Sequence, residues 1–446
     1  MSNQYLDYAK GVREEIFQQI QQPLWQQKSL KDVSKVILIL SSPRSGSSLL
    51  FHLLSQTEQL LSLNGEHTNY YKLNGYSFPF HNYQSDFLGI TNISREDFDK
   101  FSRDFLSDVC VGSEKIISTT EELQEFIQIL ALRLPTQWPQ LSLSAQQWLW
   151  YITEACKQHM EEYSTWDFTK FLLKLLELLS IFYPEFNPFY YDIQPSLLKS
   201  YFPENSCPKS PPNSHFCIEE PPFVVTKPRR RPTPEEISNK PWLLKASIDA
   251  FRLPLLQQLF PNAEFKIIHL TRFPATSING LYDGWHHRGF FSHNLEGIAN
   301  LAIPGYSDVF DWGKHWWSYE LPPQWQEVIN QPLEYVCGFQ WSSPHQVILE
   351  SLKQEKASNI LRVQFEDIIS SSQQRVRTIG RILEFMGIEE DDALKKVVDE
   401  MQPVMCSVPA DETRWLKRKS QILQVINEES IRQLINELGY GNREIA

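Results

Sequence analysis

A short polar turn carries the residues whose types and spacing are best suited to chemistry. An apolar run at 36–40, of the kind that fills a central parallel strand, precedes it, and leucines at helical spacing follow from Leu49. The turn offers a guanidinium, hydroxyl donors and free backbone N–H groups at a helix N-terminus, a combination that suits a phosphate group. Its residues are Ser42, Pro43, Arg44, Ser45, Gly46, Ser47 and Ser48. The sequence therefore predicts a phosphate-binding loop, with an ordinary Ser/Gly turn as the alternative.

The turn differs from the common nucleotide-binding pattern and resembles a different one. The pattern G-x-x-x-x-G-K-[ST] is absent because the turn has no lysine and no paired glycines. The segment 42–48 after a buried strand instead resembles the 5′-phosphosulfate loop of sulfotransferases that use 3′-phosphoadenosine 5′-phosphosulfate (PAPS). This resemblance implies that Arg44, Ser45, Gly46, Ser47 and Ser48 bind the donor and that Arg44 also takes part in the transfer.

A second segment resembles the 3′-phosphate site of the same enzymes. An apolar strand at 265–270 leads into Arg272, and Pro274 fits the first turn of the helix that follows. The resemblance implies that Arg272 grips the 3′-phosphate. The family places a serine eight residues after this arginine, but here that position is Gly280. We expect Ser277, one helical turn earlier, to replace it.

Two further segments carry the residues that the resemblance implies for catalysis. Glu66, after a glycine, matches the glutamate of tyrosylprotein sulfotransferases that takes the acceptor's proton, and His67 is the fallback base. Lys245 ends a short strand that resembles the family's lysine strand, whose ammonium stabilises charge on the leaving oxygen. A solvated loop acid and a surface lysine are the corresponding alternatives. Near the C-terminus, Arg414 and Lys417 are expected as further nucleotide contacts, although the family's glycine motif is missing there.

The elements that must position these residues predict an α/β fold, with a parallel sheet flanked by helices and the donor at the carboxyl ends of the strands. The resemblance covers roughly 35–110 and 240–440 of a single domain, 1–446. We interpret 110–235 as an inserted cap over the acceptor pocket, with helices at 119–132, 144–162 and 167–182 and a proline-rich part. Alternatively, its aromatic residues fill a second small core.

Composition limits the classes of partner. A net charge of −12 argues against broad nucleic-acid binding, while leaving room for a basic pocket. No signal peptide and no membrane-spanning run is visible, and the cysteines form no CxxC pair, so we expect a cytoplasmic protein. No metal site is expected, because neither the 207–217 segment nor the histidines at 286–293 have usual ligand spacing. The six cysteines are Cys110, Cys156, Cys207, Cys217, Cys337 and Cys406.

The resemblance implies a metal-free transfer of a sulfonate from PAPS to a hydroxyl or amine of a small-molecule acceptor, with a natural product as one candidate. Three other classes stay open. They are a P-loop kinase, a non-catalytic nucleotide-binding protein, and an enzyme that sulfonates a hydroxyl to make it a leaving group.

Overall fold

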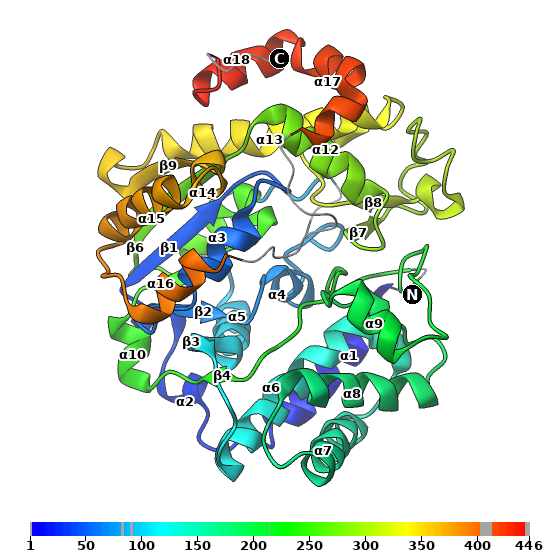
Figure 1. Ribbon diagram of the computed structural model, residues 1–446, viewed down its shortest axis with the longest axis vertical. Helices are drawn as coiled ribbons and strands as arrows, with labels where there is room; N and C mark the ends of the chain where they lie inside the picture. Colours follow the sequence, from blue (N-terminus) through cyan, green and yellow to red (C-terminus); the bar gives the residue numbers. More distant parts are fainter. Residues whose placement is uncertain (1, 82–83, 90–91, 214, 402–412, 442–446) are drawn as a thin grey trace.

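The computed structural model describes residues 2–81, 84–89, 92–213, 215–401 and 413–441. Within these ranges a seven-stranded sheet forms the centre of the molecule, with strand order β4-β3-β2-β5-β1-β6-β9 (Figure 1). A separate two-stranded ribbon pairs β7 with β8. The strands are β1 Lys35–Leu40, β2 Leu61–Leu63, β3 Val109–Glu114, β4 Arg229–Arg230, β5 Trp242–Leu244, β6 Glu264–Thr271, β7 Phe291–Asn294, β8 Trp316–Ser318 and β9 Ile360–Gln364.

The central part of the sheet is parallel. Strand β1 pairs in parallel with β5 and β6, while β2 continues the parallel order on one side and β9 on the other. Within the seven-stranded sheet only β3 is reversed, and it pairs antiparallel with β2 on one side and with the edge strand β4 on the other. The predicted fold class, a central parallel sheet flanked by helices, is confirmed.

Helices surround this sheet and extend the molecule at both ends (Figure 1). In that view α17 and α18 lie at the end opposite α7 and α8. The α-helices are α1 Ser2–Phe17, α2 Leu24–Gln27, α3 Ser47–Leu54, α4 Thr68–Leu73, α5 Arg95–Asp108, α6 Thr120–Gln137, α7 Ala145–Glu162, α8 Phe168–Phe182, α9 Pro195–Tyr201, α10 Pro234–Asn239, α11 Leu253–Leu259, α12 Pro274–Trp285, α13 Leu333–Leu352, α14 Glu366–Ile369, α15 Ser372–Met386, α16 Asp392–Asp399, α17 Lys419–Ile426 and α18 Glu429–Glu437.

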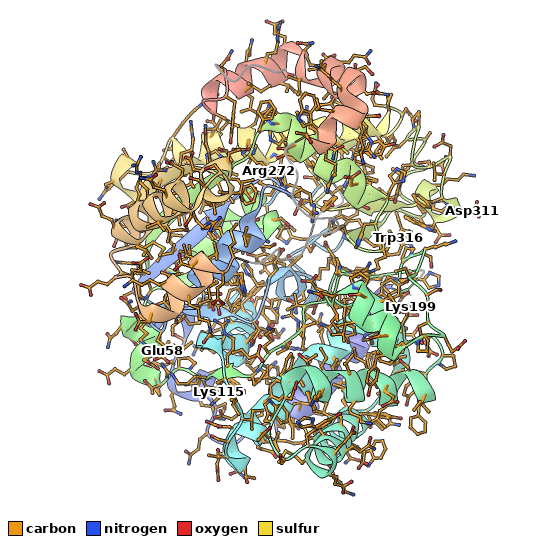
Figure 2. The ribbon with its side chains drawn as sticks, viewed as in Figure 1. Glu58, Lys115, Lys199, Arg272, Asp311 and Trp316 are labelled. Atoms are coloured by element: carbon orange, nitrogen blue, oxygen red, sulfur yellow. The ribbon has the colours of Figure 1, made fainter. Side chains whose placement is uncertain are left out.

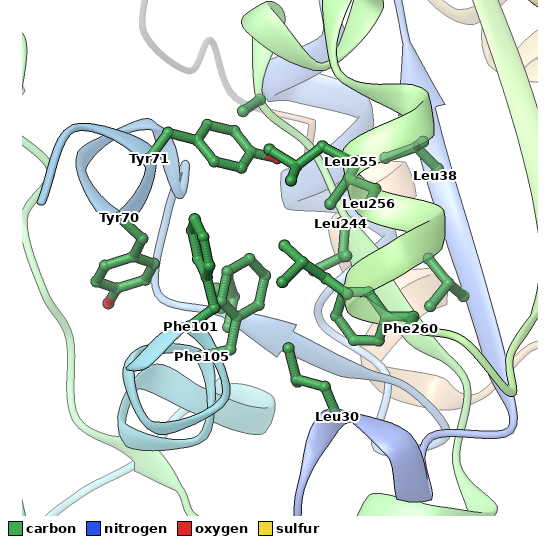
Figure 3. Close-up of a cluster of buried hydrophobic side chains, with 14 of the residues drawn as sticks. Leu30, Leu38, Tyr70, Tyr71, Phe101, Phe105, Leu244, Leu255, Leu256 and Phe260 are labelled. Atoms are coloured by element: carbon green, nitrogen blue, oxygen red, sulfur yellow. The ribbon is translucent and has the colours of Figure 1, made fainter. Parts of the chain in front are cut away.

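Strand β1 is buried on both faces, which explains its continuous apolar sequence. Val36, Leu38 and Leu40 belong to a core that includes side chains of α5 and α11. Figure 3 shows this core around Leu38, with Phe101 and Phe105 approaching from α5. The alternate residues of β1 face a second core built from α3 and α15. Because both faces are covered, the chemistry can reach solvent only at the ends of the strands.

The segment 110–235 forms a helical body with its own core. The predicted helices are present as α6, α7 and α8, and the side chains of Thr119, Ser144 and Asp167 cap their N-termini. Trp138 and Trp148 are fully buried in a core shared with α1. The aromatic residues therefore do fill a second core. The same segment supplies β3 and β4 to the main sheet, so it is joined to the sheet as well as inserted into it.

No helix in the described ranges is long and apolar enough to cross a membrane. The cysteines that the structure describes form no disulfide. Cys406 lies outside the described residues.

Candidate active site

The loop between β1 and α3 has a backbone that its glycine makes possible. Gly46 precedes α3 with φ +89°, and Arg44 also has a positive φ of 63°. A Cβ at Gly46 would lie 2.1 Å from the Phe365 ring, so a larger residue would meet both strain and a clash. Within the loop the hydroxyls of Ser42 and Ser45 are 2.7 Å apart. The chain thus turns sharply and presents the N-terminus of α3.

That N-terminus opens into a cavity of about 600 Å³. Most of the residues predicted for the site line this one cavity, although they come from four separate segments of the chain. They are Arg44, Gly46, Ser47, Ser48, Glu66, Lys245 and Arg272. Three of the predicted cationic side chains thus share the cavity with one helix N-terminus, a combination that suits an anion.

Lys245 and Glu66 form an ion pair at the carboxyl ends of β5 and β2. The Lys245 ammonium also donates to the Ser48 hydroxyl over 2.9 Å, which joins the pair to the first turn of α3. The Lys245 side chain is only 4% exposed and that of Glu66 is 32% exposed. The carboxylate therefore faces the open part of the cavity, while the ammonium lies at its floor.

The two loops predicted to hold phosphate groups are in contact. Arg272 follows β6, and its Nη1 donates to the backbone carbonyl of Arg44 over 3.0 Å. Its guanidinium also lies 4.9 Å from the centre of the Phe365 ring. Figure 2 shows Arg272 between the sheet and α12. Adjacent parallel strands β1 and β6 therefore bring Arg44 and Arg272 together from 228 residues apart.

An aromatic stack that the sequence did not reveal supports Arg44. The guanidinium lies 5.0 Å from the centre of the Phe290 ring, which stacks on Tyr319 at 4.7 Å. Phe290 and Tyr319 have φ values of 66° and 64°, in the left-handed region that side chains other than glycine rarely adopt. A Cβ at Gly284 would lie 1.6 Å from the Tyr319 hydroxyl, so α12 can pass here only with a glycine. Strained backbone thus surrounds the cavity, as is common at functional sites.

Ser45 and His67 do not line the cavity. Ser45 is fully buried beneath the loop. His67 is also fully buried, with Nε2 3.1 Å from Asp249 Oδ1 and 3.2 Å from the Tyr71 hydroxyl. In this arrangement the His67 imidazole is held in the core by polar partners and does not reach the cavity where Glu66 lies.

Ser277 and Gly280 lie in α12, behind Arg44. A Cβ at Gly280 would be 3.5 Å from the Arg44 Cβ, so the small residue allows the loop to approach the helix. Ser277 is fully buried, and its hydroxyl has no hydrogen-bond partner in the parts of the chain that the structure describes. A buried hydroxyl without a partner is uncommon. The hypothesis that Ser277 replaces the family's serine stays a prediction.

The C-terminal basic residues reach α12 in a way that the sequence did not predict. Arg414 forms a 2.9 Å ion pair with Asp283, whereas Lys417 is exposed and does not line the cavity. Arg418 donates to Asn279 Oδ1 over 2.6 Å and lies 3.0 Å from Asp283. Arg418 is therefore bound to the same helix as Arg414, with no sequence motif to distinguish it from Lys417.

Residues of the helical body and the loop after β8 complete the site. Arg133, Glu219, Glu220 and Val224 line the cavity, so the segment 110–235 supplies part of its wall. Behind the wall, burial raises the pKa of Glu320 to about 8, although a hydrogen bond with the Ser247 side chain opposes the shift. The Ser247 backbone N–H also donates to Glu66 over 3.4 Å. Ser247 thus lies between two acids, the buried Glu320 carboxyl and the Glu66 carboxylate.

No group of three or more His, Cys, Asp or Glu side chains suited to a metal ion occurs among the residues with described positions. The site is a cavity at one edge of the parallel sheet, lined by Arg44, Arg272 and the Lys245–Glu66 ion pair.

The chain is similar to several solved structures. The sulfotransferase domain from the curacin biosynthetic pathway is 13% identical, and the match covers 92% of this chain and 98% of that one with a TM-score of 0.38. The sulfotransferase domain of the Synechococcus olefin synthase is 14% identical, with 93% and 98% coverage and a TM-score of 0.35. A sulfotransferase of Mycobacterium tuberculosis is 11% identical, with 94% and 81% coverage and a TM-score of 0.33.

No family model matches the chain, and no curated protein matches it. The functional proposal rests on the geometry of the cavity.

Proposed function

We propose that this protein transfers a sulfonate group from PAPS to a hydroxyl or amine of a small-molecule acceptor. One observation carries the proposal: Arg44, Lys245, Arg272 and the N-terminus of α3 converge on a cavity that also contains the Glu66 carboxylate. Cationic side chains and backbone N–H groups suit a donor with two phosphate groups. Glu66 supplies what a simple phosphate-binding site does not need, a base at the open side of the cavity.

Lys245 and Glu66 would have different roles in the reaction. In the transfer, a bond forms between the acceptor oxygen and sulfur while the bond from sulfur to the bridging oxygen breaks. Lys245 would stabilise the negative charge that develops on the leaving phosphate oxygen, and Ser48 would orient its ammonium. Glu66 would take the proton of the acceptor. Because the two side chains are paired in the free protein, movement of the ammonium toward the donor would free the carboxylate.

Calorimetric titration of the whole chain with 3′-phosphoadenosine 5′-phosphate, without magnesium, tests the donor site. We expect tight binding of this nucleotide and weak binding of ATP. Arg44→Ala should remove about 1.5–3 kcal/mol of binding free energy, because charge-assisted hydrogen bonds are lost. Arg95→Ala is the matched control, since the Arg95 side chain is 94% exposed on α5. Preference for ATP, or binding that requires magnesium, would instead indicate a kinase-like protein.

We propose a small-molecule acceptor, because the cavity of about 600 Å³ must hold both the donor and the acceptor. A cytoplasmic location stays a prediction. Tight nucleotide binding without any turnover would favour the non-catalytic alternative.

A further inference from the structure

Two buried side chains on the cavity wall have polar atoms that the protein leaves without hydrogen bonds. Asn69, in α4, is 1% exposed, and both its Nδ2 and its Oδ1 lack a partner among the described residues. Arg133, in α6, is 3% exposed; its Nη1 and Nη2 have no hydrogen-bond partner within the same ranges. Both residues line the cavity that contains Glu66.

Unsatisfied buried groups of this kind are costly and uncommon in folded proteins. A buried donor or acceptor that makes no hydrogen bond keeps its full desolvation penalty. Here one amide and the outer end of one guanidinium are unsatisfied on the wall of a single cavity. A ligand that brings both an acceptor and a donor would satisfy them. Asn69 lies three residues after Glu66, so this ligand group would lie close to the reacting atom.

Charges around Arg133 decide what kind of group fits. Arg133 Nε donates to Glu219 over 2.5 Å, and its Nη1 lies 3.7 Å from the Asp108 carboxylate. Two carboxylates thus already face one guanidinium, in a place where charges are poorly screened. An anionic ligand would meet an excess of negative charge, although the remaining N–H groups can still donate to a neutral oxygen.

An ammonium group is also a poor fit at this wall. Besides Arg133, the Glu219 carboxylate accepts hydrogen bonds from the side chains of Thr136 and Gln137 and from the Val224 backbone N–H. Its oxygens are therefore already used by the protein. A cation placed beside Glu219 would meet the Arg133 guanidinium without gaining a free oxygen of the Glu219 carboxylate.

We propose that Asn69 and Arg133 form the acceptor subsite and that they bind a neutral carboxamide of the acceptor. The carbonyl oxygen of that amide would accept from the Arg133 terminal nitrogens and from Asn69 Nδ2. Its N–H would donate to Asn69 Oδ1, the one acceptor that is left unsatisfied on the Asn69 side chain. The acceptor is thus an alcohol, phenol or amine that carries an amide near the reacting group. This inference rests on the proposed function in so far as the bound molecule is the acceptor.

Four para-substituted phenols of similar shape test the inference. They are 4-hydroxyphenylacetamide, its hydrocarbon isostere 4-isobutylphenol, the anion 4-hydroxyphenylacetate and the cation 4-(2-aminoethyl)phenol. Binding to the whole chain is measured by calorimetry with and without 3′-phosphoadenosine 5′-phosphate, and kcat/KM is measured with PAPS. The wild-type protein should bind the amide about tenfold more tightly than each of the other three, which corresponds to one or two hydrogen bonds.

Asn69→Leu, which keeps the size of the side chain, should abolish the preference for the amide over 4-isobutylphenol. Asn262→Leu, at an exposed position outside the cavity, should leave the preference unchanged. Arg133 supports a buried ion-pair network, so the test does not depend on its substitution. Equal or weaker binding of the amide, or an Asn69→Leu variant that keeps the preference, overturns the inference. If the wild-type protein does not bind 3′-phosphoadenosine 5′-phosphate, the proposed function is refuted. The inference about Asn69 and Arg133 is still tested in that case, because phenol binding is also measured without nucleotide.

Discussion

The buried carboxyl of Glu320 should make the stability of this protein depend on pH. Glu320 is 6% exposed, and burial raises its pKa from 4.5 to about 8, with the negative charges of Glu220 and Glu66 adding to the shift. The folded protein therefore holds a proton at neutral pH that the unfolded chain releases. Because the pKa of this acid is higher in the folded state than in the unfolded state, the free energy of unfolding falls as pH rises from 4.5 to 8.

The expected size follows from that interval. Between pH 4.5 and pH 7 there are about 2.5 pH units, at roughly 1.4 kcal/mol for each unit, so the native carboxyl costs about 3 kcal/mol of stability at pH 7. Glu320→Gln keeps the shape and remains neutral. We expect this variant to match the wild-type free energy of unfolding at pH 4.5 and to exceed it by up to about 3 kcal/mol at pH 7.

Urea denaturation at several pH values between 4.5 and 8 measures this difference. Glu58→Gln is the control, because the Glu58 side chain is 74% exposed and its removal should give no such trend. A difference between wild type and Glu320→Gln that does not change with pH would refute the reasoning. So would a Glu320→Gln variant that is less stable than wild type at pH 7.

Three further predictions concern the loop, the base and the 3′-phosphate. Gly46→Ala should weaken binding of 3′-phosphoadenosine 5′-phosphate roughly 100-fold by calorimetry, because a φ of +89° is strained for alanine and the new Cβ would clash with Phe365; unchanged affinity would contradict the loop's role. Glu66→Gln should keep donor affinity but lower turnover roughly 100-fold or more, and wild-type turnover would show that another group is the base. Ser277→Ala should cost about 1 kcal/mol of binding for a 3′-phosphorylated nucleotide only; an equal loss for adenosine 5′-phosphate would contradict a contact with the 3′-phosphate.

Local sequence patterns predicted the part of the fold that carries the loops of Arg44 and Arg272. The apolar run of β1 and the leucines of α3 define a strand and a helix, and the glycine between them allows the sharp turn. The same reasoning placed β6 and the start of α12 around Arg272. Since parallel neighbours end at one edge of a sheet, the contact between the two loops also followed from the order of elements.

The rest of the site depends on tertiary contacts that no local pattern encodes. The stack of Arg44, Phe290 and Tyr319 joins three distant segments, and all three residues adopt a left-handed backbone that their residue types disfavour. Glu320 is an ordinary acid in sequence, and only burial distinguishes it. His67 is the fallback base that the resemblance implies, but successive residues point in different directions, and the His67 ring is buried in the core.

The position of Arg133 on the cavity wall also depends on tertiary contacts that local sequence patterns do not predict. The segment 110–235 could be divided into helices from capping and apolar spacing, yet nothing in those patterns indicates that Arg133 turns inward from α6. Its ion pair with Glu219 spans 86 residues and exists only in the folded chain.

Release of 3′-phosphoadenosine 5′-phosphate from PAPS, in the presence of the four phenols and without magnesium, tests the central claim most directly. The proposed function predicts release that is linked to formation of a sulfonated phenol, that is lost in Lys245→Met and that falls strongly in Glu66→Gln. Tight binding of the nucleotide without transfer of the sulfonate from PAPS, either to a phenol or to water, would contradict the claim. That result would indicate a protein that binds the nucleotide without catalysing a reaction.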